Sequence, residues 1–533
     1  MEDAVRLENI TKTFGSVIAN NNVSFNIKKG EILAILGENG SGKTTLMNMI
    51  SGIYYPDSGS IYIDGVKADI HSPKAAFSYG IGMIHQHFKL VDVFTARENI
   101  ILGLDLKERK SKKALFKEVD DIIEKYGFDI NPDKKIFEMS VSEKQTVEII
   151  KVLMRGADIL ILDEPTAVLT PQEIEKLFKI LVSMKNEDNK AIVIITHKLN
   201  EVMEISDRVT ILRKGEYIDT VLTKETTEQK LTEMMVGKKI ELKIDRPTVN
   251  VDKPLLEIRH LDILKDDGSK AIEDVSFYIR GGEILGVAGI SGCGQKELCE
   301  GIAGLRKIKK GQIAHMGVSI IGASPKEISA RGISMSFIPE DRLGMGLAPN
   351  FSITENMMLK NYGDSNYIFV NRKKAKESAK SLIRKLDIKT PSTETPVRRL
   401  SGGNVQKVLV GREIESNPNV IITAYPVRGL DINSSYLIYD ILNQQKQKGC
   451  GILFVGEDLD VMLALCDKIL VLCHGRLMGV VKAKNTTKEK LGLMMTGSLN
   501  LTEIESERNW GFAKDSNLTE EEWNRIGEEE ENA

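Results

Sequence analysis

An internal repeat of about 250 residues is the feature of this sequence that most constrains its fold. The stretch NNVSFNIKKGEILAILGENGSGKTTL in the first half realigns with EDVSFYIRGGEILGVAGISGCGQKEL in the second. Gly37 and Gly289 are equivalent in this alignment and lie 252 positions apart (289 − 37). Ser140 and Ser401, in the later pair MSVSEKQ and LSGGNVQ, lie 261 positions apart (401 − 140). We therefore expect two copies of one domain, because 533 residues also exceed what one hydrophobic core organises.

Within each copy, the hydrophobic pattern predicts an α/β domain. Segments such as VRLENITKTF and GSIYIDG alternate as half-buried strands do, whereas EILAIL, ADILILDEP and AIVIITH are typical of buried parallel strands. Residues 95–155 have the pattern of helices with charged faces. We expect a first domain over residues 1–236, a linker over 237–254, a second domain over 255–500 and an acidic tail over 501–533.

The composition limits the classes of function. A net charge of −3 gives no electrostatic reason to expect nucleic acid as a partner. No run approaches the roughly 18–20 apolar residues of a membrane-spanning helix, so we expect none. The five cysteines all lie in the second half without the spacing of metal ligands. This distribution indicates buried free thiols in a reducing compartment.

The first copy carries a complete phosphate-binding loop. GENGSGKT fits the pattern G-x-x-x-x-G-K-[ST] between a hydrophobic strand and a predicted helix, which is the context that the pattern requires. Glycines let backbone N–H groups turn inward around phosphate oxygens, and the helix N-terminus adds its dipole. Lys43 is expected to bridge the β- and γ-phosphates of ATP, and Thr44 to hold Mg²⁺. The predicted ATP-binding residues of this loop are Gly37, Glu38, Asn39, Gly40, Ser41, Gly42, Lys43, Thr44 and Thr45.

Five further positions of the first copy suit the same site. Asp163 and Glu164 end a buried strand, where the first can hold Mg²⁺ and the second can polarise the attacking water. His197 closes the next strand and can hydrogen-bond the γ-phosphate. Gln86 is a candidate for contacting the metal and the water, and Phe14 for stacking on adenine. The alternatives are a helix-capping acid pair, a strand-end histidine, a polar loop residue and a core aromatic.

The decisive motif is RRLSGGNVQK in the second copy. Together with the phosphate-binding loop and LDEP, it resembles the ABC ATPase (ATP-binding cassette) family from Val5 to about Asn500. The resemblance implies two tandem P-loop NTPase domains. Each would have a RecA-like parallel-sheet core, an N-terminal antiparallel β subdomain and a helical signature subdomain. It also implies that Ser401, Gly402 and Gly403 form the family's signature motif. This motif would start a helix that caps the γ-phosphate bound by the other half of the chain.

More narrowly, GIGMIHQHFKLVDVFTARENI, PEDRLGMGL and VGEDLD are similar to the tandem ATP-binding subunits of bacterial importers for simple sugars and nucleosides, with the nucleoside branch most similar. The resemblance implies membrane permease subunits, an extracytoplasmic substrate-binding lipoprotein and a place on the cytoplasmic face of the membrane. A sugar of the ribose or galactose type is the alternative substrate. A soluble tandem protein acting on ribosomes or nucleic acid, and an exporter ATPase, are the alternative classes.

The second copy has lost the residues of the phosphate chemistry. The positions of Lys43, Thr44, Asp163, Glu164, His197 and Gln86 are occupied there by Gln295, Lys296, Ala424, Tyr425, Glu457 and Glu340. The signature motif is altered in the first copy instead, where Ser142 replaces a glycine in MSVSEKQ. The second copy keeps Ser401, Gly402 and Gly403. We therefore predict one hydrolysing site, formed by the loop of the first copy and the signature of the second.

Overall fold

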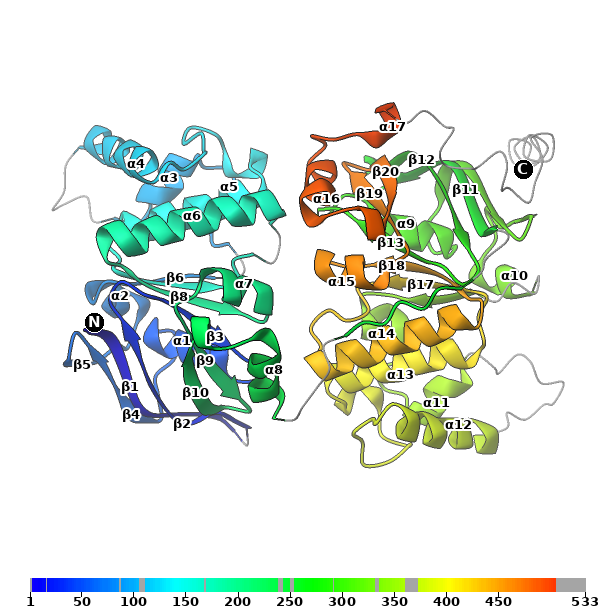
Figure 1. Cartoon of the computed structure of the whole chain (residues 1–533), viewed down its shortest axis with the longest axis horizontal. Helices are drawn as coiled ribbons and strands as arrows, with labels where there is room; N and C mark the ends of the chain where they lie inside the picture. Colours follow the sequence, from blue (N-terminus) through cyan, green and yellow to red (C-terminus); the bar gives the residue numbers. More distant parts are fainter. Residues whose placement is uncertain are drawn as a thin grey trace. The chain divides into compact units, whose positions relative to one another are not determined.

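The computed structural model describes residues 2–15, 17–85, 88–104, 111–166, 169–237, 243–249, 254–290, 292–330, 335–359 and 372–504. The chain divides into two compact units, Met1–Glu241 and Leu242–Ala533. Each unit contains one four-stranded sheet, one six-stranded sheet and surrounding helices (Figure 1). Most of the predicted acidic tail, from Glu505 onward, lies outside the described residues.

A four-stranded antiparallel sheet opens the first unit. Its strand order is β2-β1-β4-β5, and β1 pairs with both β2 and β4. On β2, the buried residues Val23, Phe25 and Ile27 alternate with less buried neighbours, as a sheet with one covered face requires. The strands are β1 (Asp3–Phe14), β2 (Val17–Lys28), β4 (Ser58–Ile63) and β5 (Val66–Ala68).

The six-stranded sheet forms the centre of the first unit. Its order is β10-β9-β3-β8-β7-β6, and only β10 runs antiparallel to its neighbour. Every residue of β3, β7 and β8 is buried, which explains their continuous apolar sequences. The strands are β3 (Ile32–Leu36), β6 (Ile81–Ile84), β7 (Ile159–Asp163), β8 (Ala191–Thr196), β9 (Arg208–Arg213) and β10 (Glu216–Leu222).

The two faces of this sheet pack into two separate cores. Leu33 and Ile35 join the antiparallel sheet and α1, whereas Ile32 joins the core of α3 to α6. In Figure 1, α3, α4 and α5 form a helical group on the side of the central sheet opposite to β1 and β2. The helices are α1 (Lys43–Ile50), α2 (Pro73–Ser78), α3 (Ala96–Ile101), α4 (Lys112–Tyr126), α5 (Val141–Leu153), α6 (Pro171–Asp188), α7 (Leu199–Ile205) and α8 (Glu228–Val236).

The second unit repeats this topology strand for strand. Its sheets have the orders β12-β11-β14-β15 and β16-β17-β18-β13-β19-β20. The strands are β11 (Pro254–Leu264), β12 (Lys270–Arg280), β13 (Ile284–Ala288), β14 (Ile308–His315), β15 (Val318–Ser319), β16 (Met335–Ile338), β17 (Val420–Ala424), β18 (Gly451–Val455), β19 (Lys468–Cys473) and β20 (Arg476–Lys482).

The helices of the second unit follow the same sequence of elements. They are α9 (Gln295–Ile302), α10 (Pro325–Ala330), α11 (Ile353–Met358), α12 (Arg372–Lys385), α13 (Gly402–Glu415), α14 (Ile432–Gln447), α15 (Leu459–Leu465), α16 (Lys488–Met495) and α17 (Leu501–Ile504). A π-helical turn, η3 (Arg342–Gly346), follows β16.

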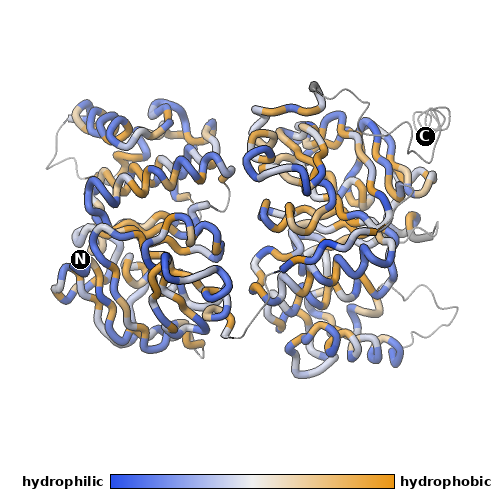
Figure 2. Tube along the Cα trace, viewed as in Figure 1, coloured by the Kyte–Doolittle hydropathy of each residue, from blue (hydrophilic) through white to orange (hydrophobic). Residues whose placement is uncertain are grey.

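The predicted fold class is confirmed in both units. Each has a mainly parallel central sheet, an antiparallel sheet and a group of helices, and Figure 2 shows hydrophobic residues concentrated along the central strands. The five cysteines are free and buried, as expected. Within the described part of the chain, no helix has both the length and the apolar character of a membrane span.

Part of the predicted linker is held by the second unit. Residues 243–249 form no helix or strand. The guanidinium group of Arg246 donates to the carbonyl oxygens of Leu463 and Cys466, at 3.2 and 2.6 Å. The side chain of Asn443 donates to the carbonyl oxygen of Asp245. These bonds attach residues 245 and 246 to the second unit, which begins at Leu242.

A buried ion pair anchors the central strand of the second unit. Asp467 accepts from the backbone N–H of Ile284 at 2.9 Å and from the Lys446 ammonium at 2.7 Å. The side chain of Lys446 is only 1% exposed. The first unit has an equivalent pair, Lys185 and Asp207, at 3.2 Å, but the lysine there is 16% exposed. The same anchor is therefore buried more deeply in the second unit.

We predict that Asp467→Ala destabilises its unit by about 3 kcal/mol, because it leaves the buried Lys446 without a counter-charge. Asp207→Ala is the matched control, and its effect should be smaller since Lys185 reaches solvent. Calorimetry of the full-length variants measures both. Equal losses in the two units would contradict the role assigned to burial.

Candidate functional site

The loop between β3 and α1 has the geometry of a phosphate cradle. Gly40 and Gly42 have positive φ angles of 79° and 94°, which side-chain-bearing residues rarely adopt. A Cβ atom on Gly42 would lie 2.3 Å from the carbonyl oxygen of Ala19. A Cβ atom on Gly37 would lie 2.3 Å from the carbonyl oxygen of Leu212. Packing therefore requires glycine at positions 37 and 42, and the left-handed backbone conformation favours it at positions 40 and 42.

Lys43 places a buried positive charge inside this loop. Its ammonium donates to the carbonyl oxygens of Gly37 and Glu38 at 2.6 and 3.1 Å, and the residue is 6% exposed. Burial lowers the pKa of Lys43, against the attraction of Glu164 and Asp163. Among the described residues, the buried hydroxyl of Ser41 has no hydrogen-bond partner. A buried cation beside an unused hydroxyl suits an anionic ligand.

The other residues of the loop differ in accessibility. Asn39 and Gly40 are exposed at its tip, Thr44 is exposed at the start of α1, and Glu38 and Thr45 are half-buried. The exposed Thr44 and the tip of the loop are thus open to a ligand, whereas the Lys43 ammonium lies buried against backbone carbonyl oxygens.

The strand order brings the predicted acids next to this loop. β8 lies between β3 and β7, so the ends of these parallel strands share one edge of the sheet. Burial and the neighbouring Glu164 raise the pKa of Asp163, against a hydrogen bond from Thr44 and the charge of Lys43. A buried carboxylate bonded to a hydroxyl provides two oxygen ligands for Mg²⁺, and ATP phosphates commonly supply others. No cluster of three or more His, Cys, Asp or Glu side chains that could hold a metal ion occurs among the described residues. A metal ion at this site therefore needs phosphate oxygens in addition to the Asp163 carboxylate and the Thr44 hydroxyl.

Glu164 is held by its backbone and by His197. Its φ angle of 48° is unusual for a residue with a side chain. Its backbone N–H donates to the carbonyl oxygen of Ile195 at 2.9 Å. His197 Nδ1 lies 2.9 Å from Glu164 Oε1. This hydrogen bond lowers the pKa of Glu164, although burial opposes it, so the carboxylate is ionised and oriented at neutral pH.

Two predicted residues lie apart from this cluster or outside the described chain. Phe14 ends β1, is 44% exposed and contacts Tyr54 edge to face, with ring centroids 5.2 Å apart. Sequence reasoning missed Tyr54, because no spacing rule connects it to Phe14. Gln86 lies outside the described residues.

The second unit keeps the shape of the loop without its charge. Gly292 and Gly294 repeat the positive φ angles, at 88° and 99°. Gln295, at the position of Lys43, is 3% exposed and donates to the carbonyl oxygen of Ile290 at 3.2 Å. Lys296 does not replace the lost ammonium, because it lies 3.8 Å from Glu300 on its own helix. The loop thus holds a neutral side chain where the first unit holds a cation.

An arginine that the sequence did not single out organises the rest of this region. Arg428 pairs with Glu340, and its Nε lies 3.2 Å from Glu457 Oε1. Its guanidinium carbon lies 5.9 Å from the centre of the Tyr425 ring. These two glutamates occupy the positions of Gln86 and His197 and bring negative charge to this region. Arg428 neutralises part of that charge. A cavity of about 340 Å³ beside this group is lined in part by Lys296 and Glu340.

The helix that follows each signature sequence begins differently in the two units. In the first, Ser140 and Glu143 form a reciprocal capping box at the start of α5: the Ser140 hydroxyl accepts from the Glu143 N–H at 3.2 Å, and the Glu143 carboxylate accepts from the Ser140 N–H at 2.7 Å. Burial opposes ionisation of Glu143, yet Lys134 and the Ser140 N–H lower its pKa overall. This helix start already carries an anion.

In the second unit, Ser401 precedes α13 without capping it, and the first turn contains no acid. The Ser401 hydroxyl accepts instead from the side-chain amide of Asn404 at 2.9 Å. Asn404 replaces Glu143 in the alignment of the repeats. The start of α13, with Gly402 and Gly403, therefore has no side-chain cap and no first-turn acid of its own, and suits an external anion.

Comparison with known proteins agrees with this geometry. A family model described as ABC transporter matches residues 20–167 and 272–426. The chain is 41% identical over 507 residues to the nucleoside import ATP-binding protein NupA of Lactococcus lactis, covering 93% of this chain and 98% of that protein. It is 42% identical over 503 residues to the guanosine import ATP-binding protein NupO of Bacillus subtilis, with the same coverage. It is 35% identical over 500 residues to the ribose import ATP-binding protein RbsA of Bacillus subtilis, covering 92% of this chain and 99% of that protein. The chain belongs to the ABC transporter family and is an ATPase of that family with two tandem ATP-binding cassettes.

Proposed function

We propose that this chain is the energy-coupling ATPase of a nucleoside importer and that it hydrolyses ATP at one composite site. The site combines the phosphate-binding loop of the first unit with the signature helix of the second. The observation that carries the proposal is the contrast between the two helix starts: α13 has no acid or side-chain cap, whereas α5 has both. The uncapped helix, α13, belongs to the second unit, whose own phosphate-binding loop has Gln295 in place of the lysine.

The first unit supplies the chemistry of hydrolysis. On ATP binding, the Lys43 ammonium exchanges its carbonyl contacts for β- and γ-phosphate oxygens, while the loop N–H groups bind the remaining oxygens. The ATP-binding residues of this loop are Gly37, Glu38, Asn39, Gly40, Ser41, Gly42, Lys43, Thr44 and Thr45, and Phe14 stacks on the base. Thr44, Asp163 and Gln86 hold Mg²⁺, which neutralises phosphate charge when bound.

Glu164 and His197 act on the water and the terminal phosphate. The Glu164 carboxylate accepts a hydrogen bond from the water that attacks the γ-phosphorus, and ADP leaves. On ATP binding, His197 exchanges its hydrogen bond to Glu164 for one to a γ-phosphate oxygen. Gln86 contacts the same water. Ser401, Gly402 and Gly403 bind the γ-phosphate from the opposite side through the helix start.

The second loop takes no part in hydrolysis in this proposal. Gln295 supplies no charge, Tyr425 replaces the carboxylate that polarises water, and Arg428 occupies the region with its own ion pairs. The second unit is retained for its open signature helix. Loss of the γ-phosphate then removes a shared contact between the cassettes and permits reopening.

The transport role rests on the relatives. Two of them carry nucleoside or guanosine import in their names and one carries ribose import. We propose membrane permease subunits and an extracytoplasmic binding lipoprotein as partners, and the cytoplasmic face of the membrane as the location. A simple sugar is the second candidate substrate, favoured by the ribose relative. The names of these relatives argue against an exporter and against a protein that acts on ribosomes or nucleic acid.

The substrate proposal predicts that proteoliposomes with the chain, its permease subunits and its binding lipoprotein accumulate labelled guanosine on addition of ATP. Excess unlabelled adenosine or inosine should compete with guanosine for uptake, whereas excess ribose should not. This expectation rests on the two relatives named for nucleoside and guanosine import. Uptake of ribose without uptake of nucleosides would establish the second candidate.

We predict that Lys43→Ala and Glu164→Gln each lower ATP turnover at least about 100-fold, because each removes a preorganised group that acts on the transferred phosphoryl group. Gln295→Ala, the same truncation at the equivalent buried position of the second unit, should change turnover less than about twofold. Phosphate release by the purified complex measures all three. Equal losses in Lys43→Ala and Gln295→Ala would contradict the asymmetric site.

The helix-start contrast gives a sharper test. Asn404→Glu recreates in α13 the spacing of the capping box of α5, so a carboxylate would occupy the helix start and engage the Ser401 hydroxyl. Turnover should fall at least about tenfold, while the melting temperature stays level or rises because the cap stabilises the helix.

Asn404→Gln is the matched neutral control, and it should keep most of the activity. Glu143→Gln tests the opposite unit and should leave turnover near wild type. Full activity in Asn404→Glu, or an equal loss in Asn404→Gln, would contradict the role of the open helix start.

A further inference from the structure

The helix α12 carries a strong excess of positive charge. Its sequence RKKAKESAKSLIRK holds seven basic residues and one acid. The equivalent helix of the first unit, α4, reads KKALFKEVDDIIEKY and has four basic and four acidic residues. The whole chain has a net charge of −3. The net positive charge of α12 is thus not shared by the equivalent helix of the first unit.

The basic residues of α12 lie on its exposed side. Ala379 and Leu382 are buried and attach the helix to its unit. With 100° between successive residues, Lys373, Lys380 and Arg384 fall within about 40° of one another on the opposite side. All three are exposed. We refer to Lys373, Lys380 and Arg384 as the basic stripe.

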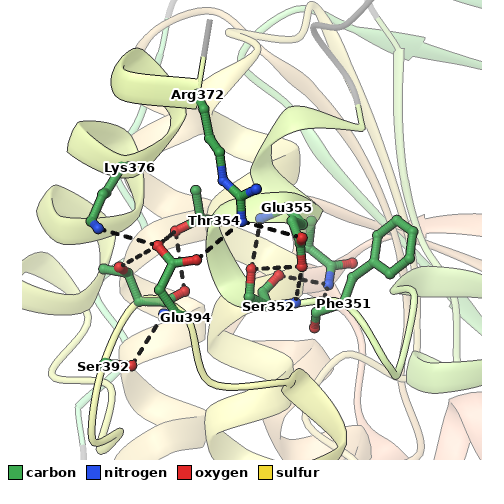
Figure 3. Close-up of polar contacts among 10 residues, drawn as sticks. Phe351, Ser352, Thr354, Glu355, Arg372, Lys376, Ser392 and Glu394 are labelled. Atoms are coloured by element: carbon green, nitrogen blue, oxygen red, sulfur yellow. Dashed lines mark hydrogen bonds and ion pairs between the residues drawn. The ribbon is translucent and has the colours of Figure 1, made fainter. Parts of the chain in front are cut away.

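Two other cations of this helix form ion pairs with acids nearby. Figure 3 shows Arg372 reaching Glu355 and Glu394, both at 3.3 Å, and Lys376 reaching Glu394 at 3.4 Å. No described residue forms an ion pair with Lys373 or Lys380, and the described hydrogen bond of the Arg384 side chain goes to a backbone carbonyl oxygen. Glu377, the one acid of the helix, falls within about 40° of Lys373 on the same side. The stripe with this acid keeps a net charge of +2 (3 − 1), which is left for another anionic group.

The same chain contains an anionic segment of similar magnitude. Residues 505–533 hold ten acidic and three basic residues, a net charge of −7 (3 − 10), against +6 (7 − 1) for α12. This segment continues from α17, which belongs to the same unit as α12. Twenty-nine residues can span at most about 100 Å, whereas a unit of this size is roughly 50 Å across. The segment is long enough to reach the stripe from any point on the unit.

We propose that the basic stripe of α12 is the docking surface for the acidic segment 505–533 of the same chain. Covalent attachment gives the segment an effective concentration in the millimolar range, so weak ion pairs suffice for binding. Because the contact is between exposed charges, it weakens as ionic strength rises. The docked segment shields the stripe from other polyanions, including anionic lipid headgroups.

The positions of the tryptophans make the proposal directly measurable. The chain has two, Trp510 and Trp523, and both lie in the acidic segment. Intrinsic tryptophan fluorescence of the full chain therefore reports on this segment alone. Acrylamide is a neutral quencher, so its quenching constant measures the accessibility of the two rings without a bias from charge.

The test compares the wild type with the triple variant K373Q/K380Q/R384Q. At 50 mM salt, the acrylamide quenching constant should rise about twofold in the variant, and fluorescence anisotropy should fall, because the segment is released. At 500 mM salt the wild type should match the variant. The control is K112Q/K113Q/K117Q on α4, which removes three positive charges from the equivalent helix and should leave both signals unchanged.

The alternative occupant of the basic stripe is an anionic membrane surface. Binding to vesicles of phosphatidylserine and phosphatidylcholine distinguishes it from the acidic segment. If the segment covers the stripe, deletion of residues 505–533 should increase vesicle binding severalfold, and K373Q/K380Q/R384Q should abolish the increase. Identical quenching in wild type and triple variant overturns the proposal. So does vesicle binding that needs the stripe but does not change on deletion, because the stripe would then serve a membrane surface.

Discussion

The site depends on one buried positive charge. The Lys43 ammonium lies inside a loop in which Gly37 and Gly42 leave no space for a Cβ atom, and burial lowers the pKa of Lys43. Its hydrogen bonds go to backbone carbonyl oxygens, while Asp163 and Glu164 supply charge at longer range. A phosphate group gives this cation a full counter-charge, and its oxygens also accept hydrogen bonds from the backbone N–H groups of the loop. The strand order matters because it brings Asp163, Glu164 and His197 to the same edge of the sheet as the loop of Lys43.

The two units show that the scaffold and the chemistry are separable. Glu164 and Tyr425 share nearly the same positive φ, at 48° and 51°, and both loops keep their paired glycine conformations. The backbone is thus common to both units, because it is set by buried apolar strands that neither unit has lost. The chemistry depends on a few polar side chains, which the second unit has replaced. Arg428 then compensates the charge of two of the replacements.

Much of this was predictable from local sequence. Continuous apolar runs define the parallel strands, and a glycine-rich turn between strand and helix defines the loop. Asp163 follows from the rule that parallel strands end at one edge. The capping box at α5 was readable in the spacing Ser140-x-x-Glu143. Arg428 was not, because its position between Glu340 and Glu457 requires three separate loops to converge. The pairing of Phe14 with Tyr54 also depends on tertiary packing.

The central claim is that one ATP is bound by the loop of the first unit and by the signature helix of the second. The most direct measurement is an ATP-bound structure of the assembled transporter in which hydrolysis has been blocked at Glu164. We expect a terminal phosphate within hydrogen-bond distance of both Lys43 and Ser401, with no such phosphate at Gln295 held by Ser140. A terminal phosphate that contacts Lys43 while Ser401 lies remote from it would contradict the account.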